Sequence, residues 1–496
     1  MKFRIAILIC SVLFFSLFAC SSNEEGVSDP ISGTETSVSD ETTSGAEGIE
    51  EIRVTVDVPD ADFDQYEYSI AILDSMLDTR FYMNSDTREL SGDLINDAIY
   101  IRNRAVEEKF NIIITQNALT DIQTSAKNII LAGDKIGDSI ITRIDYINKW
   151  AIEGLLYNLY DVPYLDMDKP YWDQNLKNEL AFKGKLYFNT GDISVMDDMR
   201  TACLIFNKGV WEDHSLPNPY EMVNNMTWTF DSYYTTCLDV TSDLDGDGAY
   251  TENDLWGIMS EKSGGNFFFF ASGEHMVKNN ADGVPELALG GSNIPSIVEE
   301  VVKINVNPKI MIYDKMLQPA AEAYLVATQL FQENKVLIRT AVFEPVPRDL
   351  RAMETDFGVL PMPLYNESQD RYHNIVLADG HALCIPVSIA EADLERTGII
   401  TEYLAYSSMD TLTEEFHNVS ITTKFLRDTD SLEMIKLIFD TKLFDFGFYY
   451  QIGDYQNLFR NMVDTGSNDF ASKYESSKSS AESKLFDIIE QFSVIN

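Results

Sequence analysis

Short apolar runs and amphipathic helical stretches alternate along the chain from residue 65 onward. Five apolar runs predict buried strands, at 68–73, 111–115, 139–142, 202–206 and 335–338. In the stretch 95–110, apolar residues recur on one face of a helix, at Ile95, Ile99, Val106 and Phe110. Further helices are predicted from Asp121 and over 293–304, 318–333, 390–405 and most of 430–492. Strands separated by helices predict an α/β protein whose parallel sheets are covered by helices on both faces.

The N-terminus has the pattern of an export signal. Lys2 and Arg4 precede a mostly apolar run over 5–19, which is shorter than the ~20 residues of a membrane-spanning helix. The run ends in Leu17-Phe18-Ala19-Cys20, which resembles the signal of bacterial lipoproteins. That resemblance implies removal of residues 1–19, lipid on Cys20, and a protein held on the extracellular face of the cell membrane. The alternative is an ordinary secretory signal that happens to contain a cysteine.

Residues 20–50 are predicted to form a flexible tether. After Cys20 they are mainly Ser, Thr, Glu, Asp and Gly, with no aromatic residue. Such a segment cannot bury enough apolar surface to offset the entropy lost on ordering. A disordered terminus without an anchor is the alternative, and Cys20 favours the tether.

The charge of the chain argues against one class of partner. The formal net charge is −43, and the acidic residues are spread along the sequence. Such a surface repels phosphate backbones, so nucleic acid is not an expected partner. Three cysteines follow the tether, Cys203, Cys237 and Cys384. Since an odd and sparse set does not make a disulfide framework, each is expected to be a small buried apolar residue.

Residues 243–254 carry the most specific chemical pattern in the chain. They have carboxylates at positions 1, 3, 5 and 12 of a twelve-residue loop and a glycine, Gly248, at position 6. This spacing is typical of a loop that surrounds one calcium ion with oxygen ligands. The expected ligands are the side chains of Asp243, Asp245, Asp247 and Asp254 and the backbone carbonyl of Ala249, with Thr251 reaching the ion directly or through water. Because a helix is predicted before the loop and a strand after it, the ion is expected to be structural. An acidic turn without metal is the alternative.

Sequence motifs of enzymes are mostly missing. No two of the five histidines are four residues apart, so the chain has no helical zinc pair. It also lacks the Gly-x-Ser-x-Gly elbow, the phosphate-binding Gly-x-x-x-x-Gly-Lys loop and the dinucleotide glycine fingerprint. The chain is therefore not expected to be an enzyme, although a catalytic carboxylate pair among its eighty acidic residues stays open.

Several segments carry a resemblance to a known family. They are 92–110, Leu204-Ile205-Phe206-Asn207-Lys208, Trp228-Thr229-Phe230-Asp231, Asp356-Phe357-Gly358-Val359-Leu360-Pro361-Met362-Pro363, and 427–434 with Phe444-Asp445-Phe446-Gly447. In their order and spacing they resemble the sugar-binding group of extracellular solute-binding lipoproteins of ABC importers, which includes the maltose-type receptors. The resemblance covers nearly all of 65–465.

The resemblance implies two α/β lobes that close over a ligand, as in the type II periplasmic-binding-protein fold. Lobe 1 is expected to comprise 51–203 and 364–415. Lobe 2 is expected to comprise 204–363 and 416–496 and to contain the loop 243–254. Hinges are expected near 204–208, 356–363 and 375–387. A ligand between the lobes agrees with the place where open α/β sheets bind ligands.

Seven residues are candidates for contact with the ligand, because they follow predicted strands or lie in loops near the expected cleft. They are Arg143, Asp145, Tyr146, Asp197, Phe343, Glu344 and Tyr449. Aromatic faces stack on sugar rings, and planar polar groups pair with hydroxyls. For each aromatic residue the alternative is core packing, and for each acid a solvated loop. The chain lacks the tryptophan that the maltose type has near 343, which leaves the identity of the sugar, and sugar as the ligand class, open.

Three functions are open at this point. The resemblance implies a monomeric, lipid-anchored binding protein that delivers a solute, expected to be a carbohydrate or oligosaccharide, to the permease subunits of an ABC transporter. The second is a receptor of the same fold that presents its ligand to a signalling partner. The third is a calcium-stabilised surface enzyme that acts on glycosides through two carboxylates, since a fold alone does not fix a function.

Overall fold

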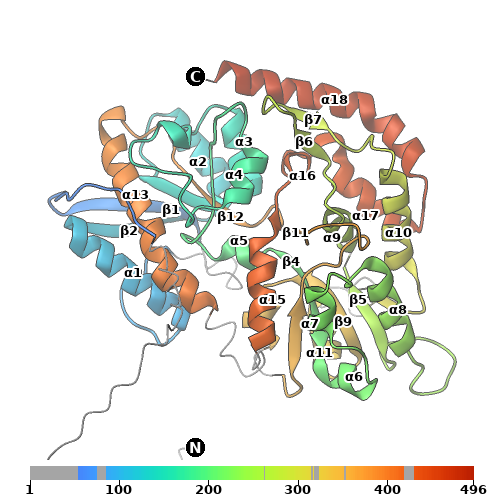
Figure 1. Ribbon diagram of the computed structural model, residues 1–496. Helices are drawn as coiled ribbons and strands as arrows, with labels where there is room; N and C mark the ends of the chain where they lie inside the picture. The colour runs from blue at the N-terminus through green and yellow to red at the C-terminus, as the bar shows by residue number, and fades with distance from the viewer. Residues whose placement is uncertain are drawn as a thin grey trace, which may run out of the picture. The chain divides into compact units, whose positions relative to one another are not determined.

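Two mixed sheets are the framework of the protein in the computed structural model (Figure 1), which describes residues 54–74, 85–261, 263–313, 317, 323–350, 353–417 and 429–495. The first sheet has the strand order β12-β3-β1-β2, and the second has the order β10-β4-β9-β5-β8. The strands are β1 (Tyr66–Leu73), β2 (Ile112–Leu119), β3 (Ser139–Arg143), β4 (Ala202–Asn207), β5 (Trp256–Ser260), β8 (Met311–Tyr313), β9 (Val336–Val342), β10 (Phe357–Leu360) and β12 (His381–Cys384). All five strands that the apolar runs predict are present. The predicted signal 1–19, Cys20 and the tether 20–50 lie outside the described residues.

The first sheet is built around β1, which runs parallel to both β2 and β3. Helix α1 (Leu94–Phe110) begins where Asp93 Oδ1 accepts a hydrogen bond from Asn96 N at 3.0 Å. It ends at Asn111, which has a left-handed φ of 50°. The four apolar residues predicted to share one face are all buried, and α1 packs against α13 (Leu394–Ser408).

The second sheet has a parallel core of β9, β5 and β8. Strand β4 runs antiparallel to β9, and β10 runs antiparallel to β4, as β12 does to β3 in the first sheet. The prediction of purely parallel sheets is therefore wrong. A βαβ crossover makes strands parallel, but β4 and β12 follow passages of the chain from one sheet to the other, so that constraint does not apply to them.

The chain passes between the sheets just before β4. Thr201 forms an isolated bridge with Val376, and Leu377 N donates to Arg200 O at 2.9 Å. Nearby, β11 (Asn374–Ile375) pairs in parallel with β13 (Lys442–Leu443). Of the expected hinge at 204–208, residues 204–207 are hydrogen-bonded within the second sheet to β10 and, at 204–206, also to β9; the hinge stays a prediction.

Helices surround both sheets (Figure 1). The others are α2 (Ile122–Leu131), α3 (Ile144–Ile152), α4 (Gln174–Leu180), α5 (Met196–Met199), α6 (Lys208–Asp213), α7 (Pro219–Asn224), α8 (Phe230–Val240), α9 (Gly264–Ala271), α10 (Ile294–Val306), α11 (Ala323–Gln332), α12 (Pro345–Arg348), α15 (Thr429–Asp440), α16 (Phe446–Tyr449), α17 (Tyr455–Thr465) and α18 (Phe470–Val494). The predicted helical stretch 430–492 is thus divided into four helices. Within the described residues, no helix has both the length and the hydropathy needed to cross a membrane.

Candidate functional site

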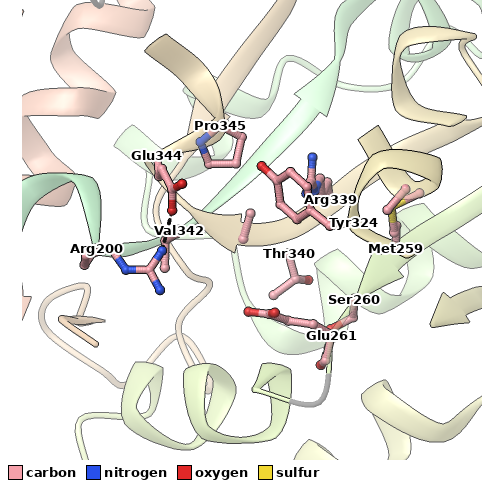
Figure 2. Close-up of a pocket in the computed structure, with 12 residues that line it drawn as sticks. Arg200, Met259, Ser260, Glu261, Tyr324, Arg339, Thr340, Val342, Glu344 and Pro345 are labelled. Carbon is pink, nitrogen blue, oxygen red and sulfur yellow. Dashed lines mark hydrogen bonds and ion pairs between the residues drawn. The ribbon is translucent and has the colours of Figure 1, made fainter. Parts of the chain in front are cut away.

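A cavity of about 180 Å³ lies at the ends of β5 and β9 in the second sheet (Figure 2). It is lined by Arg200, Met259, Ser260, Glu261, Tyr324, Ala327, Arg339, Thr340, Ala341, Val342, Glu344 and Pro345. The carboxyl ends of parallel strands are where open α/β sheets bind ligands. The volume is below the roughly 300–1,000 Å³ of a pocket that encloses a whole small molecule. The cavity therefore suits one part of a larger ligand.

Tyr324 supplies the aromatic surface of the cavity. It lies on α11, and its side chain is 39% exposed. The guanidinium groups of Arg339 and Arg348 lie 4.9 Å and 5.1 Å from the centre of its ring. Its hydroxyl donates to Asp349 and accepts from Arg348, which fixes the ring in place. A fixed, partly exposed ring can stack on a flat apolar face of a ligand.

Arg200 and Glu344 form the polar side of the cavity. Arg200 Nη1 donates to Glu344 Oε2, and Glu344 also forms an ion pair with Arg348. Arg200 Nε donates to Asp379 Oδ1 at 2.9 Å. Because Asp379 lies between β11 and β12, Arg200 connects the cavity in the second sheet with the segment that leads into the first. The candidate Glu344 therefore does line a cavity, with its carboxylate held between two arginines.

Three further candidates come together at the end of β3 in the first sheet. Arg143 Nε and Nη2 donate to the two carboxylate oxygens of Asp145 at 2.9 Å and 2.7 Å. The Arg143 guanidinium lies 4.9 Å from the centre of the Tyr146 ring. Asp145 N donates to Ala378 O at 2.9 Å. This group therefore lies beside the segment that carries Asp379, the partner of Arg200.

Two aromatic candidates are core residues. Phe343 is 0% exposed and packs edge-to-face against Phe416 and Phe439, at centroid distances of 6.1 Å and 5.1 Å. Tyr449 is buried, and its hydroxyl donates to Val376 O at 2.8 Å. The expectation that these rings stack on ligand is wrong. Phe343 N donates to Thr201 O at 3.0 Å, so the pairing of β4 with β9 extends by one residue there, while the side chain of Phe343 packs in the core.

Asp197 is also withdrawn from solvent. It is 0% exposed and accepts from Lys442 Nζ at 2.6 Å. The same ammonium lies 2.9 Å from Asp173 and 3.0 Å from Asp198. Burial and the two neighbouring carboxylates raise the pKa of Asp197, although Lys442 opposes the shift. The prediction of a ligand contact at Asp197 is therefore wrong; its carboxylate ties the start of β4 to β13.

The sequence reading missed the main cavity residues. Arg339 belongs to the strand predicted from 335 and Tyr324 to the helix predicted over 318–333, and neither is among the candidate ligand contacts. One signal was present: Arg339 is the only charged residue in the strand Val336–Val342, whose residues are all buried. A charged residue inside a buried strand is rare unless it has a partner or a function.

The loop 243–254 gathers three of its four predicted carboxylates. One oxygen each of Asp243, Asp245 and Asp247 lies within 4.8 Å of the others. Gly246 and Gly248 have φ values of +74° and +82°, which permit the sharp turns of the loop. Ala249 N donates to Asp247 Oδ1 at 2.7 Å. The helix before the loop and the strand after it are α8 and β5, as predicted.

Asp254 lies apart from the other three carboxylates. It is buried, and its two oxygens accept from Leu244 N at 2.9 Å and from Thr251 N at 2.7 Å. These backbone hydrogen bonds lower its pKa, the bond from Thr251 most strongly. Asp254 thus stabilises the loop by accepting hydrogen bonds from two backbone N–H groups of the loop itself. The three clustered carboxylates repel one another, and a hard cation with oxygen ligands fits them.

Known structures resemble the chain over most of its length. M. tuberculosis UspC matches with a TM-score of 0.56 and 11% identity, covering 84% of this chain and 100% of that one. A cyclo/maltodextrin-binding protein complexed with maltotetraose matches with a TM-score of 0.53 and 15% identity, covering 86% and 96%. An ABC substrate-binding protein from Listeria monocytogenes in complex with cycloalternan gives 0.52 and 12%, covering 86% and 98%.

In sequence, no protein-family model matches the chain, and no curated protein matches it. The structural likeness, at identities below 25%, establishes the fold. It confirms the architecture that the sequence resemblance implied. The chain therefore has the two-lobed, type II periplasmic-binding-protein fold, which it shares with the ABC substrate-binding protein and the cyclo/maltodextrin-binding protein.

Proposed function

We propose that the chain is a lipid-anchored extracellular binding protein that captures a carbohydrate and delivers it to the permease of an ABC importer. The observation that carries the proposal is the likeness to sugar-bound solute-binding proteins over 86% of the chain. The cavity at the ends of β5 and β9 supports it, because it offers an aromatic ring and planar polar groups at the strand ends.

The proposed ligand lies between two groups of residues. One group is Tyr324, Arg339 and Glu344 beside the second sheet, and the other is Arg143 with Tyr146 at the end of β3. Arg200 and its partner Asp379 lie between them. A ligand that contacts both groups at once binds the closed state more tightly than the open state. This difference in affinity drives closure of the lobes.

Binding is favoured over hydrolysis. The solved neighbours with bound sugars are described as binding proteins. Within the cavity, the carboxylate of Glu344 is already paired with Arg200 and Arg348.

A structural calcium ion in the loop 243–254 and lipid on Cys20 are parts of the same proposal. Asp243, Asp245 and Asp247 would hold the ion between α8 and β5. The ion would supply positive charge and would fix the loop between these two elements.

Titration calorimetry against a panel of oligosaccharides tests the proposal, with chromatography of each sugar after incubation. The expected result is saturable binding of at least one saccharide, recovered intact. A cleaved product would establish an enzyme, and no binding across neutral and acidic panels would contradict the proposed function.

A further inference from the structure

Arg339 is a buried arginine whose donors are mostly unused. Its side chain is 6% exposed, and Nη1 donates to Thr328 Oγ1 at 3.1 Å, the one hydrogen bond that its guanidinium makes with the described residues. No aspartate or glutamate of the described ranges forms an ion pair with it. A guanidinium has five N–H donors and stays charged, so most of its binding capacity is open.

A second buried arginine, Arg102, shows how the fold supplies hydrogen-bond acceptors to a guanidinium that has only a structural role. Arg102 is 2% exposed and forms no ion pair among the described residues. It donates to Asn103 Oδ1 at 3.0 Å, Ser85 O at 3.1 Å, and Ile193 O and Ser408 Oγ, both at 3.3 Å. A purely structural arginine is thus surrounded by acceptors. Arg339 is not, and it lines a cavity.

The arginines around the cavity also differ from Arg339. Arg200 is paired with Glu344 and Asp379, and Arg348 is paired with Glu344 and Asp349. Figure 2 shows Arg339 and Tyr324 on one side of the cavity and Arg200 and Glu344 on the other. The guanidinium without a carboxylate partner among the described residues therefore lies at the Arg339–Tyr324 side.

We propose that the ligand of this cavity is an acidic saccharide whose carboxylate pairs with Arg339. A planar carboxylate matches the fork of a guanidinium and can accept two of its N–H groups at once. Tyr324, whose ring lies 4.9 Å from that guanidinium, is placed to contact the adjoining sugar ring. The inference rests on the proposed function, because it names the class of saccharide that the same site takes.

The charge of the surroundings makes the docking selective. The formal net charge of −43 and the cavity's own Glu261 and Glu344 disfavour an anion at most positions. Glu344 is offset by Arg200 and Arg348, so Arg339 is the lining cation that no carboxylate of the described chain neutralises. A neutral sugar would leave that charge buried and uncompensated, which is unfavourable.

The test compares acids with their uncharged counterparts. Di- and trisaccharides of galacturonate, glucuronate and mannuronate are titrated by calorimetry, each beside its methyl ester and beside a neutral oligosaccharide of equal length. Citrate serves as a carboxylate that is not a sugar. The variants are Arg339→Gln, which removes the charge, and Arg339→Lys, which keeps the charge without the fork. Arg460→Gln on α17 is the matched control, because Arg460 does not line the cavity.

The expected result is that at least one uronate binds at least about tenfold more tightly than its ester. Arg339→Gln removes that preference, Arg339→Lys retains part of it, and Arg460→Gln leaves it unchanged. Equal affinity for acid and ester, or a preference that survives Arg339→Gln, overturns the inference. Binding of neutral sugars alone also overturns it and leaves the proposed function standing. Binding of citrate without any saccharide overturns both.

Discussion

The buried ion cluster around Lys442 gives a sharp test of how the chain is held together between its sheets. Its single ammonium lies 2.6 to 3.0 Å from Asp173 and from the consecutive residues Asp197 and Asp198, so it joins two parts of the chain to β13. Replacing Lys442 by methionine keeps the length of the side chain and removes the charge. Three buried carboxylates then lose their common partner.

The expected loss of stability is large. Removing one partner of a buried ion pair costs about 3–5 kcal/mol, because the remaining charge is left in a poorly solvated place. At about 2–4 °C per kcal/mol for a unit of 150–250 residues, the melting temperature should fall on the order of 10 °C. Lys436→Met is the matched control. Lys436 is 75% exposed and pairs with Asp440, so its loss should cost less than about 0.5 kcal/mol.

The stability that Lys442→Met loses should depend on pH in a defined direction. Burial raises the pKa of Asp192 to about 7 and raises the pKa of Asp197 as well, and Lys442 opposes both shifts. The folded state therefore holds protons that the unfolded state has lost between pH 4 and 7, roughly the interval between the ordinary carboxyl pKa and the raised ones. Stability from these groups is present at low pH and is lost as the pH rises through 7.

Without Lys442, the stability should fall more steeply as the pH rises, because the ammonium no longer opposes protonation of Asp192 and Asp197. Urea unfolding followed by circular dichroism at pH 5 and pH 8 measures it. The deficit of Lys442→Met should be smaller at pH 5, where the carboxylates take up protons. A loss of stability below about 1 kcal/mol, or one that is equal at both pH values, would contradict the role assigned to Lys442.

Three further predictions follow from the calcium loop, the core and the anchor. A chelator should lower the melting temperature of the calcium-loaded protein and should have little effect on Asp245→Ala; identical melts of calcium-loaded wild type with and without chelator would contradict a structural ion. Phe343→Ala should lose about 3–5 kcal/mol in urea unfolding, whereas Tyr146→Ala should lose less than about 1 kcal/mol and weaken ligand binding; equal losses would contradict the core assignment of Phe343. Cys20→Ser should move the protein from the membrane to the soluble fraction of fractionated cells, and unchanged membrane retention would contradict the anchor.

The sequence predicted the elements better than their directions. Each of the five apolar runs corresponds to a strand of one of the two sheets, because a strand that is buried on both faces leaves a strong pattern in the sequence. The antiparallel entry of β4 and β12 was missed, since direction depends on how the chain returns from the other sheet and leaves no local pattern in either strand.

The candidate site was predicted less well, for a related reason. Phe343 directly follows a strand, and Tyr449, which the sequence predicts in a loop, is the last residue of α16. At such positions a sequence does not state on which side of the backbone a side chain lies. Arg339 was the detectable exception, because a charge inside an apolar strand conflicts with its surroundings. Local conflicts of this kind are expected at functional positions.

Small-angle scattering tests the central claim, capture of a ligand by closure of two lobes, most directly. The radius of gyration of the purified protein is measured without ligand and at saturation with a saccharide whose binding calorimetry has established. The expected result is a smaller radius of gyration at saturation, because contacts from both sheets favour the closed arrangement. An unchanged radius at saturation would contradict it.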